Sequence, residues 1–531
     1  MATDARLASP AVTGAHPAAT SKWLVAISIL LGSIMATIDT SVVNIAFVHI
    51  QATFGASLQE VTWVTTSYLT TVVLVMPLTA WLASVLGRKR MYLFSVIIFT
   101  VASALCGFSR TLGQLIAFRV LQGLGGGALQ PVAQSIMRET FPPRQQAQAM
   151  GLFGMLVLLG PAIGPTLGGY LVDNYSWPWI FFVNLPVGVL SLFMVSQFIV
   201  DPPYMRARGL QKIDGVGIGL LAAGLTSLLV MLEQGEKEGW FGSPFIVILG
   251  LVAAVTLMGF ILWELHTPSP AVNLRILTNS SFAAGTLIIG VLGVALFGGL
   301  ILLPLFLQNL LGYDATQAGL ALMPRSLMMV LMMPVAGALY NVLGVYVMAS
   351  VGLVLAAAST FLMARFTLDT GSLQILIPQI GQGVAFAFIF VSISTTAMST
   401  IPRPQMQGAT GLYNLVRQLG GSLGTAIIVT LVDHKTTTAS ANLVRYATPY
   451  NPTFMAWWQR FQAGFAARGI DEGKARLQAL SVLGREISRQ ASVVAFDYAF
   501  AWMGVLFLCC LPLVLLLRRG VPVEEGTPTA E

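Results

Sequence analysis

The sequence predicts an all-α protein that crosses a membrane many times. Of its 531 residues, 56% are hydrophobic and only 9% are charged, whereas soluble domains are about a quarter charged. The mean hydropathy is +0.79, and apolar stretches of about twenty residues, the length that crosses a bilayer, recur along the whole chain. These observations exclude a soluble fold and also a catalytic domain held by a single anchor.

Fourteen segments are long and apolar enough to cross about 30 Å of hydrocarbon. The residues before the first one are rich in Ala, Thr and Pro and lack the basic n-region of a signal peptide, and no small-residue cleavage site follows the first span, so we expect this stretch to be retained as a span. The predicted spans lie near residues 23–47, 60–84, 91–109, 113–137, 147–172, 178–199, 214–232, 245–264, 282–307, 316–339, 345–365, 373–398, 409–432 and 493–517.

Basic residues gather in alternate loops and predict the orientation of the chain. By the positive-inside bias, both termini are cytoplasmic. The net charge of +7 therefore reflects membrane orientation rather than binding to nucleic acid. The basic residues on the cytoplasmic side are Arg88, Lys89, Arg90, Arg138, Arg144, Arg206, Arg208, Lys212, Arg275, Arg403, Arg518 and Arg519, and the short opposite loops hold little beyond Arg110, Lys237 and Arg365.

The second half of the chain repeats the first. At an offset of 260 positions, 11 of the 43 residues in 122–164 are identical, and at an offset of 257 Pro77 and Gly87 align with Pro334 and Gly344. The aligned pieces share their orientation, so the repeats are parallel and related by an axis along the membrane normal. We therefore expect two pseudo-symmetric six-helix bundles with an inserted helix pair. The expected divisions are a cytoplasmic tail at 1–22, a bundle at 23–200, the inserted pair at 201–265, a bundle at 266–517 that carries an outer loop at 433–492, and a second cytoplasmic tail at 518–531.

Charged residues inside the predicted spans are candidates for function. Asp39 lies in the first span, where an ionised carboxylate costs roughly 3 kcal/mol or more. Such a group can hold a proton until it meets water or a cation, so we expect Asp39 to couple proton movement; the alternative is a hydrogen bond to Asn44 or to a neighbouring helix. Arg119 is the matching cation in the fourth span, and it either modulates a nearby acid or binds backbone carbonyls. Arg325 and Arg417 are the corresponding cations of the second half.

A stripe of glycine and proline marks the fifth span. Its small residues allow close helix contact and its prolines remove ladder hydrogen bonds, so it predicts tight packing, a hinge, or both. The stripe consists of Gly154, Gly160, Pro161, Gly164, Pro165, Gly168 and Gly169. The turn Gly87-Arg88-Lys89-Arg90 between the second and third spans is interpreted as a topology anchor, with a gate latch as the alternative.

Polar and aromatic residues within the spans are candidates for a substrate cavity, although most such aromatic residues face lipid or core. These candidates are Asn44, Trp63, Tyr68, Gln122, Asn184, Phe386, Tyr413, Asn414 and Arg417. In the outer loop, Trp458, Phe461 and Phe465 recur at helical spacing, as do Leu477, Leu480, Leu483 and Ile487 after the predicted N-cap Asp471. These amphipathic helices would cover the outer mouth, lie on the lipid surface or dock a partner.

Two apparent enzyme motifs lie inside apolar spans rather than after strands. Residues 123–128 fit a dinucleotide fingerprint and residues 420–424 fit a nucleophile elbow, but both patterns are meaningful only in a strand-turn-helix context. The four histidines are scattered, and Cys106, Cys509 and Cys510 form no disulfide or metal pattern. We therefore expect no enzyme activity, no metal and no cofactor.

The motifs together resemble the major facilitator superfamily, and within it the fourteen-helix drug:proton antiporters of the EmrB and QacA type, with EmrB-like proteins as the better match. Asp39-Thr-Ser-Val-Val-Asn44 resembles the first-span acidic motif, and Arg119-x-x-Gln122-Gly123 the fourth-span motif linked to proton coupling. The stripe at 160–169 resembles the antiporter motif of exporters, and residues 179–188 the sixth-span signature. The loop motif departs from the family pattern, because Ser84-Val85 stands where an Asp-Arg pair is usual.

This resemblance implies a multidrug efflux antiporter that exports hydrophobic or amphipathic compounds in exchange for protons. The outer loop is similar to that of EmrB-like proteins, which implies a periplasmic adaptor (EmrA-like), an outer-membrane channel (TolC-like) and a location in a bacterial inner membrane. The alternatives are a transporter of one specific metabolite or lipid-like compound and, from other classes, a non-transporting membrane sensor or a membrane enzyme. A proton-coupled exporter is the function that the sequence favours.

Overall fold

The structure is a computed structural model, and it describes residues 21–201 and 214–518. Most of the two predicted tails, the segment 202–213 with Arg206, Arg208 and Lys212, and Arg519 lie outside the described residues. Within the described ranges, every regular element is a helix. The α-helices are α1 (Lys22–Ile45), α2 (Phe47–Phe54), α3 (Leu58–Leu86), α4 (Arg88–Gly107), α5 (Leu112–Thr140), α6 (Gln146–Asn174), α7 (Trp179–Phe182), α8 (Asn184–Phe198), α9 (Gly215–Gln234), α10 (Pro244–His266), α11 (Ser280–Asn309), α12 (Ala315–Met363), α13 (Ser372–Ser399), α14 (Met406–Val444), α15 (Pro452–Ala466), α16 (Glu472–Cys509) and α17 (Leu511–Val514).

The helices of the described residues are consistent with the fourteen predicted spans. Eleven helical segments of the described chain are long and apolar enough to cross a membrane. One of them, α12, joins two predicted spans, because it bends at Gly344, whose φ of 73° is open to glycine but strained for other residues. Helices α5 and α6 have 29 residues each, which is also long enough for a crossing. The chain is therefore an all-helical, multi-pass membrane protein.

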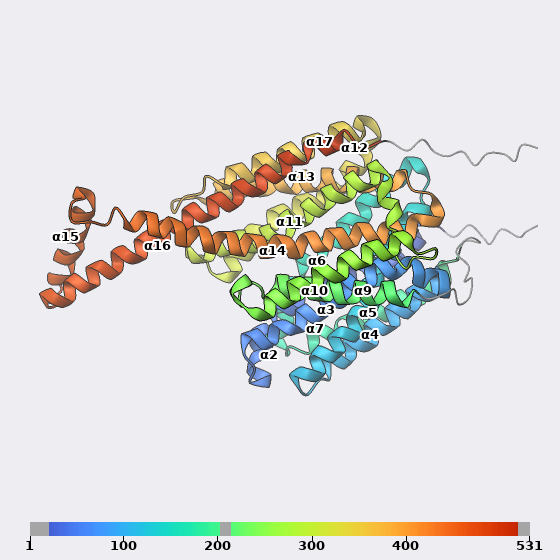
Figure 1. Cartoon of the computed structure of the whole chain (residues 1–531), viewed down its shortest axis with the longest axis horizontal. Coiled ribbons are helices and arrows are strands. Elements are labelled where there is room, and N and C mark those ends of the chain that lie inside the picture. The colour runs from blue at the N-terminus through green and yellow to red at the C-terminus, as the bar shows by residue number, and fades with distance from the viewer. Residues whose placement is uncertain (1–20, 202–213, 519–531) are drawn as a thin grey trace, which may run out of the picture.

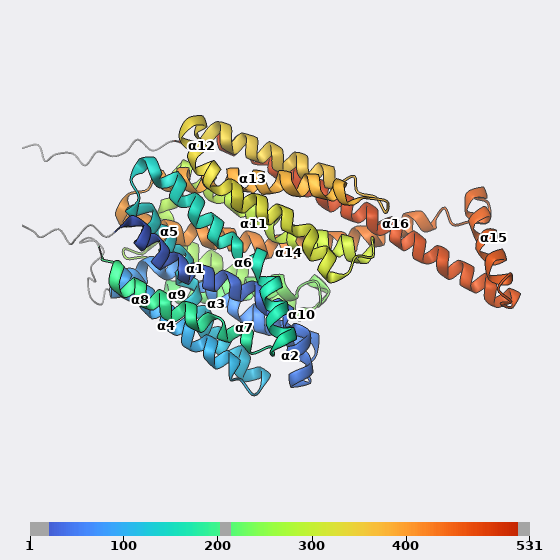
Figure 2. The same cartoon turned by 180° about the vertical axis from the view of Figure 1, so that it is seen from behind.

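The long helices run side by side in two groups (Figures 1 and 2). In the first group, α1 packs against α6 and α8, while α5 packs against α3 and α4. In the second, α11 packs against α14, α12 against α13, and α16 against both α12 and α14. Helices α9 and α10 form a hairpin that packs on α3 and also contacts α14. This arrangement is the one that two six-helix bundles with an inserted pair would produce.

Contacts between the two groups gather near the end that holds the turn between α5 and α6. We call this contact region the seam. A Cβ atom on Gly151 of α6 would lie 2.6 Å from the carbonyl oxygen of Met333, and one on Gly411 of α14 would lie 2.6 Å from that of Met76. Asn414 Nδ2 donates to Gln134 Oε1 at 2.6 Å across the same seam. The seam therefore brings the helix backbones of the two groups into direct contact at this end.

The segment 433–492, which the sequence predicts to cover the outer mouth, lie on lipid or dock a partner, forms a helical protrusion. Helix α14 continues past the predicted end of its span at 432 as far as Val444, and α16 is one 38-residue helix from Glu472 into the last span. Figure 1 shows α15 at the far end of this protrusion, well away from the bundles. The predicted helices around Trp458 and after Asp471 are confirmed, and Asp471 caps α16 by accepting a hydrogen bond from the Gly473 N–H.

Candidate functional site

Asp39 is a buried carboxylate in the middle of the first bundle. It lies on α1 and is only 1% exposed. The neighbouring hydroxyl groups bond to backbone carbonyls, as Thr40 Oγ1 does to that of Ala36 on the same helix at 3.0 Å and Ser41 Oγ to that of Gly160 on α6 at 2.9 Å. The partners of the Asp39 carboxylate therefore come from other helices.

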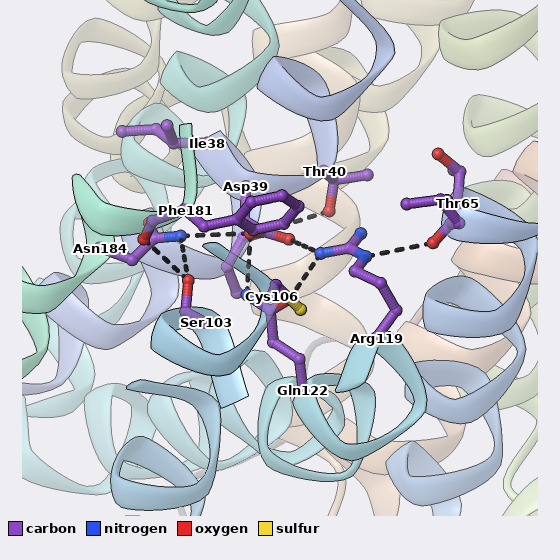
Figure 3. Close-up of polar contacts among 12 residues, drawn as sticks. Ile38, Asp39, Thr40, Thr65, Ser103, Cys106, Arg119, Gln122, Phe181 and Asn184 are labelled. Atoms are coloured by element: carbon purple, nitrogen blue, oxygen red, sulfur yellow. Dashed lines mark hydrogen bonds and ion pairs between the residues drawn. The ribbon is translucent and has the colours of Figure 1, made fainter. Parts of the chain in front are cut away.

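Three side chains donate hydrogen bonds to the Asp39 carboxylate (Figure 3). Arg119 Nη1 on α5 lies 2.6 Å from Oδ2, and Gln122 Nε2 on the same helix lies 2.8 Å from Oδ1. Asn184 Nδ2 at the start of α8 donates to Oδ1 at 3.1 Å. Asn44, the predicted alternative partner, is exposed and instead accepts a hydrogen bond from Thr65 Oγ1 at 3.3 Å. Asp39 is thus held by an ion pair and two amide groups.

Arg119 is completely buried and lies at the centre of this network. Its Nε donates to the Val64 carbonyl at 3.1 Å, and its Nη1 also donates to Gln122 Oε1 at 2.7 Å. The guanidinium lies over the ring of Tyr68, 4.0 Å from the ring centroid. Arg119 therefore both binds the acid and contacts a backbone carbonyl, so the two roles that the sequence left open are combined in one side chain.

The spacing of the α5 residues explains why they converge. Arg119 and Gln122 are three positions apart and so share a helix face. The glycines that follow bring α5 close to its neighbours: a Cβ on Gly123 would lie 2.8 Å from the Tyr68 carbonyl oxygen, and one on Gly125 would lie 2.5 Å from the Phe99 nitrogen. The glycine run that fits a dinucleotide fingerprint is thus a helix-packing surface in this structure.

Two residues of the network were not found by sequence reasoning. Ser103 Oγ on α4 accepts a hydrogen bond from Asn184 Nδ2 at 3.1 Å and donates to the Phe181 carbonyl at 2.9 Å. Cys106 Sγ on the same helix lies 3.7 Å from Gln122 Oε1. Both are small, neutral residues of a kind that is common in spans, so no charge or spacing marks them in the sequence.

The glycine stripe of α6 packs against the part of α1 that carries Asp39. A Cβ on Gly160 would lie 2.5 Å from Thr37 Cβ, and Ser41 Oγ donates to the Gly160 carbonyl at 2.9 Å. A Cβ on Gly164 would overlap Ser41, and one on Gly168 would approach Val42. Gly154 faces Phe390 on α13 and Gly169 faces open space, while Pro161 and Pro165 lie within the helix. The stripe therefore fixes the distance between α6 and the acidic helix.

The basic turn between α3 and α4 is held within the first bundle. Gly87 adopts a positive φ of 83°, and Arg88, which is 4% exposed, forms an ion pair with Glu139 at the end of α5 (Nη1 to Oε2, 2.6 Å). The Lys89 N–H donates to Asp201 Oδ1 at 2.7 Å, and Arg90 is exposed. These recorded contacts anchor the turn, and none of them reaches the second bundle.

The remaining cavity candidates are dispersed in this structure. Phe386 and Tyr413 are completely buried, and Phe386 packs against Phe507 of α16 with ring centroids 6.0 Å apart. Asn414 lies in the seam, and so does Arg417, whose Nη2 donates to Gln130 Oε1 and to Asn414 Oδ1. Trp63 is half-buried near the start of α3. Gln122, Asn184 and Tyr68, which are also predicted to line a cavity, contact Asp39 or Arg119.

The described residues hold no group of three or more His, Cys, Asp or Glu side chains that could bind a metal ion. At the site itself, the ion pair of Asp39 and Arg119 determines what a proton would do. A proton bound by Asp39 would neutralise the carboxylate and leave the buried guanidinium of Arg119, which cannot lose its own proton, without a counter-ion. Protonation of Asp39 and its ion pair with Arg119 are thus mutually exclusive.

Comparison with known proteins gives concordant results. Residues 29–425 match the model of the Major Facilitator Superfamily. The chain is 34% identical to the multidrug export protein EmrB of Escherichia coli, covering 92% of this chain and 94% of the relative. It is 31% identical to the fatty acid resistance protein FarB of Neisseria gonorrhoeae, covering 94% and 97%. Among solved structures, the human organic anion transporter MFSD10 covers 93% of this chain and 99% of its own, with a TM-score of 0.60 and 14% identity, a likeness of fold alone.

Proposed function

Since this chain belongs to the major facilitator superfamily and is related to EmrB-type multidrug export proteins, we propose that it exports hydrophobic or amphipathic compounds across a bacterial inner membrane in exchange for protons. The observation that carries the proposal is the carboxylate of Asp39, buried among spans and paired with Arg119. Intramembrane acids are expensive, and they mark proton or ion pathways in transporters.

The proposed cycle alternates between two states of the bundles. In one state, Asp39 is ionised and paired with Arg119, as in this structure; in the other, Asp39 is protonated and the pair is broken. Helix α1 carries Asp39 and packs against the glycine stripe of α6. A shift of α1 when Asp39 gains or loses a proton would therefore alter the contact between these two helices. One proton that moves down about 130 mV yields roughly 3 kcal/mol, enough for on the order of a hundredfold substrate gradient.

The seam is the proposed gate on the cytoplasmic side. It is built from close glycine contacts and from hydrogen bonds of neutral amide groups. Asn414 donates to Gln134, and Arg417 donates to Gln130. Neutral polar groups can exchange these partners for water when the bundles separate, so the seam is suited to repeated opening. With the seam formed, the described structure corresponds to a state that is closed toward the cytoplasm, where both termini are proposed to lie.

Proton release on binding tests this function directly. Addition of the neutral hydrophobic probe 1-pyrenebutanol to purified protein in weakly buffered detergent solution should release protons from the wild type but not from an Asp39→Asn variant. In proteoliposomes, an imposed pH gradient should drive export, and an ionophore that collapses the gradient should stop it. Export that continued at the same rate after collapse would contradict the proposal.

The protrusion is the proposed docking site for a periplasmic adaptor of the EmrA type, which would connect the transporter to a TolC-like outer-membrane channel. It projects from the bundles instead of covering them, and α15 at its tip has no buried residue (Figure 1). Residues 433–492 hold eight basic and four acidic side chains. A projecting, exposed and amphipathic helix of this kind is suited to a protein partner.

Removal of the tip should separate transport from resistance. Replacing residues 446–470 with a short Gly-Ser linker between α14 and α16 is expected to leave transport in proteoliposomes within twofold of the wild type, because the spans and Asp39 are untouched. Drug resistance of intact cells should fall at least tenfold, since the adaptor would lose its contact. Resistance that stays at the wild-type level in cells would contradict docking at this tip.

A further inference from the structure

The internal repeat places Arg325 of the second bundle where Tyr68 stands in the first. The offset of 257 that aligns Pro77 with Pro334 also aligns Tyr68 with Arg325. Helix contacts agree: a Cβ on Gly123 would lie 2.8 Å from the Tyr68 carbonyl oxygen, and one on Gly383 would lie 2.5 Å from the Arg325 carbonyl oxygen. The two bundles therefore hold the same kind of site, built from different side chains.

The copy in the second bundle has lost the acid. At the offset of 260, Arg119 and Gln122 correspond to Gln379 and Gln382. The contact of α6 with α1 also has a counterpart, which is the contact of α14 with α11. Gly160 approaches Thr37 in the first bundle, and Gly420 approaches Gly290 in the second. One turn further along, Gly164 approaches Ser41 and Gly424 approaches Val294. Asp39, two residues after Thr37, therefore corresponds to Leu292, two residues after Gly290. The first site holds an acid and an arginine, whereas the second holds an arginine and two amides.

Arg325 is a buried cation without a counter-ion. It is 2% exposed, and its guanidinium forms no hydrogen bond or ion pair with any residue that the structure describes. Its Nη1 reaches α11, where a Cβ on Gly299 would lie 2.9 Å away. On α13, Gln379 Oε1 is buried without a partner and Gln382 Nε2 has only the Met363 sulfur at 3.9 Å. The polar groups of this copy thus retain unused hydrogen-bonding capacity.

The other buried arginine of the second bundle is different. Arg417 also lacks an acidic partner, but its Nη2 donates to Gln130 Oε1 and to Asn414 Oδ1 across the seam. Its contacts give Arg417 a structural role in the seam. The Arg325 guanidinium makes no such contact with the residues that the structure describes, and a guanidinium remains charged at every physiological pH. A lone buried charge is expensive, and a planar carboxylate is the ligand that matches a guanidinium in both charge and shape.

We infer that Arg325 recognises an anionic group of the transported compound, so that the protein prefers hydrophobic acids over their neutral analogues. This inference rests on the proposed export function and deepens it by naming the substrate class. Arg325 follows Pro324, which removes a backbone hydrogen bond within α12. The turn that carries Arg325 can therefore adjust when the bundles tilt and bring the guanidinium to the substrate.

Two probes that share an apolar pyrene group and differ in their negative charge test this inference. Binding of 1-pyrenebutyrate and of 1-pyrenebutanol to the purified full-length protein is measured by fluorescence anisotropy at a pH where the acid is ionised. We expect the wild type to bind the butyrate at least tenfold more tightly. Arg325→Gln should abolish this ratio and change the affinity for the butanol less than threefold, whereas Arg325→Lys should keep part of the ratio. Arg110→Gln removes a cation from an exposed site and should leave both affinities unchanged.

A second pair of variants tests the charge of Arg325 without replacing the arginine. Gly299→Asp would place a carboxylate beside Arg325 Nη1 and should abolish the preference, while Gly299→Ala adds the same Cβ without charge and should keep it. The inference is overturned if the wild type binds the two probes equally, or if the ratio survives in both Arg325→Gln and Gly299→Asp. Because binding is measured without a gradient, loss of gradient-driven export with the ratio intact would instead refute the proposed function alone.

Discussion

Replacing Asp39 with asparagine is expected to abolish proton-driven transport. Asparagine cannot bind and release a proton, so the two states of the pump would no longer be linked to the proton gradient. We expect export in proteoliposomes with an imposed pH gradient to fall at least a hundredfold. Normal export by this variant would remove Asp39 from the mechanism.

The same substitution should also lower stability, which requires a control. Asp39→Asn leaves the buried guanidinium of Arg119 without its ion pair, and breaking a buried pair in this way costs about 3–5 kcal/mol. The double variant Asp39→Asn with Arg119→Gln should therefore regain much of the lost thermal stability but remain inactive. Arg110→Gln, at an exposed position just before α5, should keep both stability and export.

Replacing Gly164 with alanine is expected to disable the contact between α6 and α1. The added Cβ would overlap the side chain of Ser41, which lies two residues from Asp39, so the two helices must move apart. Overpacking of this kind typically costs about 1–3 kcal/mol, and here it also displaces the acid from Arg119. We expect export to fall at least tenfold and the melting temperature of the detergent-solubilised protein to drop.

Gly169 offers a matched control in the same stripe. A Cβ there would meet nothing within 4 Å, so Gly169→Ala should resemble the wild type in export and melting temperature. Ser41→Gly should make room for the methyl group and restore export to the Gly164→Ala variant. Equal losses in Gly164→Ala and Gly169→Ala would show that flexibility of α6, and not its contact with α1, is what the glycines provide.

Much of the fold follows from the sequence because lipid imposes simple rules. A crossing helix needs about twenty apolar residues, and an acid or arginine within such a stretch stands out because its burial is expensive. Asp39 and Arg119 were found by this reasoning. The sequence also predicts that their partners Gln122 and Asn184 line a cavity. An uncharged amide in a span can either line a cavity or bind a buried acid, and the sequence alone does not distinguish these two roles. The contact of Ser103 with Asn184 depends on how α4 packs, which no local pattern encodes.

The protrusion shows a different limit of sequence reasoning. Hydropathy falls after residue 432 because the chain leaves the hydrocarbon, and the sequence therefore predicts that the span ends there. Helix α14 nevertheless continues to Val444, because residues 433–444 contain no Gly or Pro to interrupt its backbone hydrogen bonds. Hydropathy reports where lipid ends, whereas the end of a helix is set by its backbone and caps.

Helix α16 also has a mechanical consequence. Its 38 residues form one rod of about 57 Å that passes from the protrusion into the second bundle. Its base is fastened to the bundle, where Arg489 Nη2 donates to the Leu310 carbonyl at 2.7 Å. The part of α16 that projects beyond this contact, from Arg489 back to Glu472, is about 26 Å long, so a rotation of the bundle by about ten degrees carries its far end through roughly 4–5 Å relative to the contact. Any molecule bound to α15 would therefore be displaced whenever the second bundle tilts, so movement inside the membrane would be transmitted beyond the lipid surface.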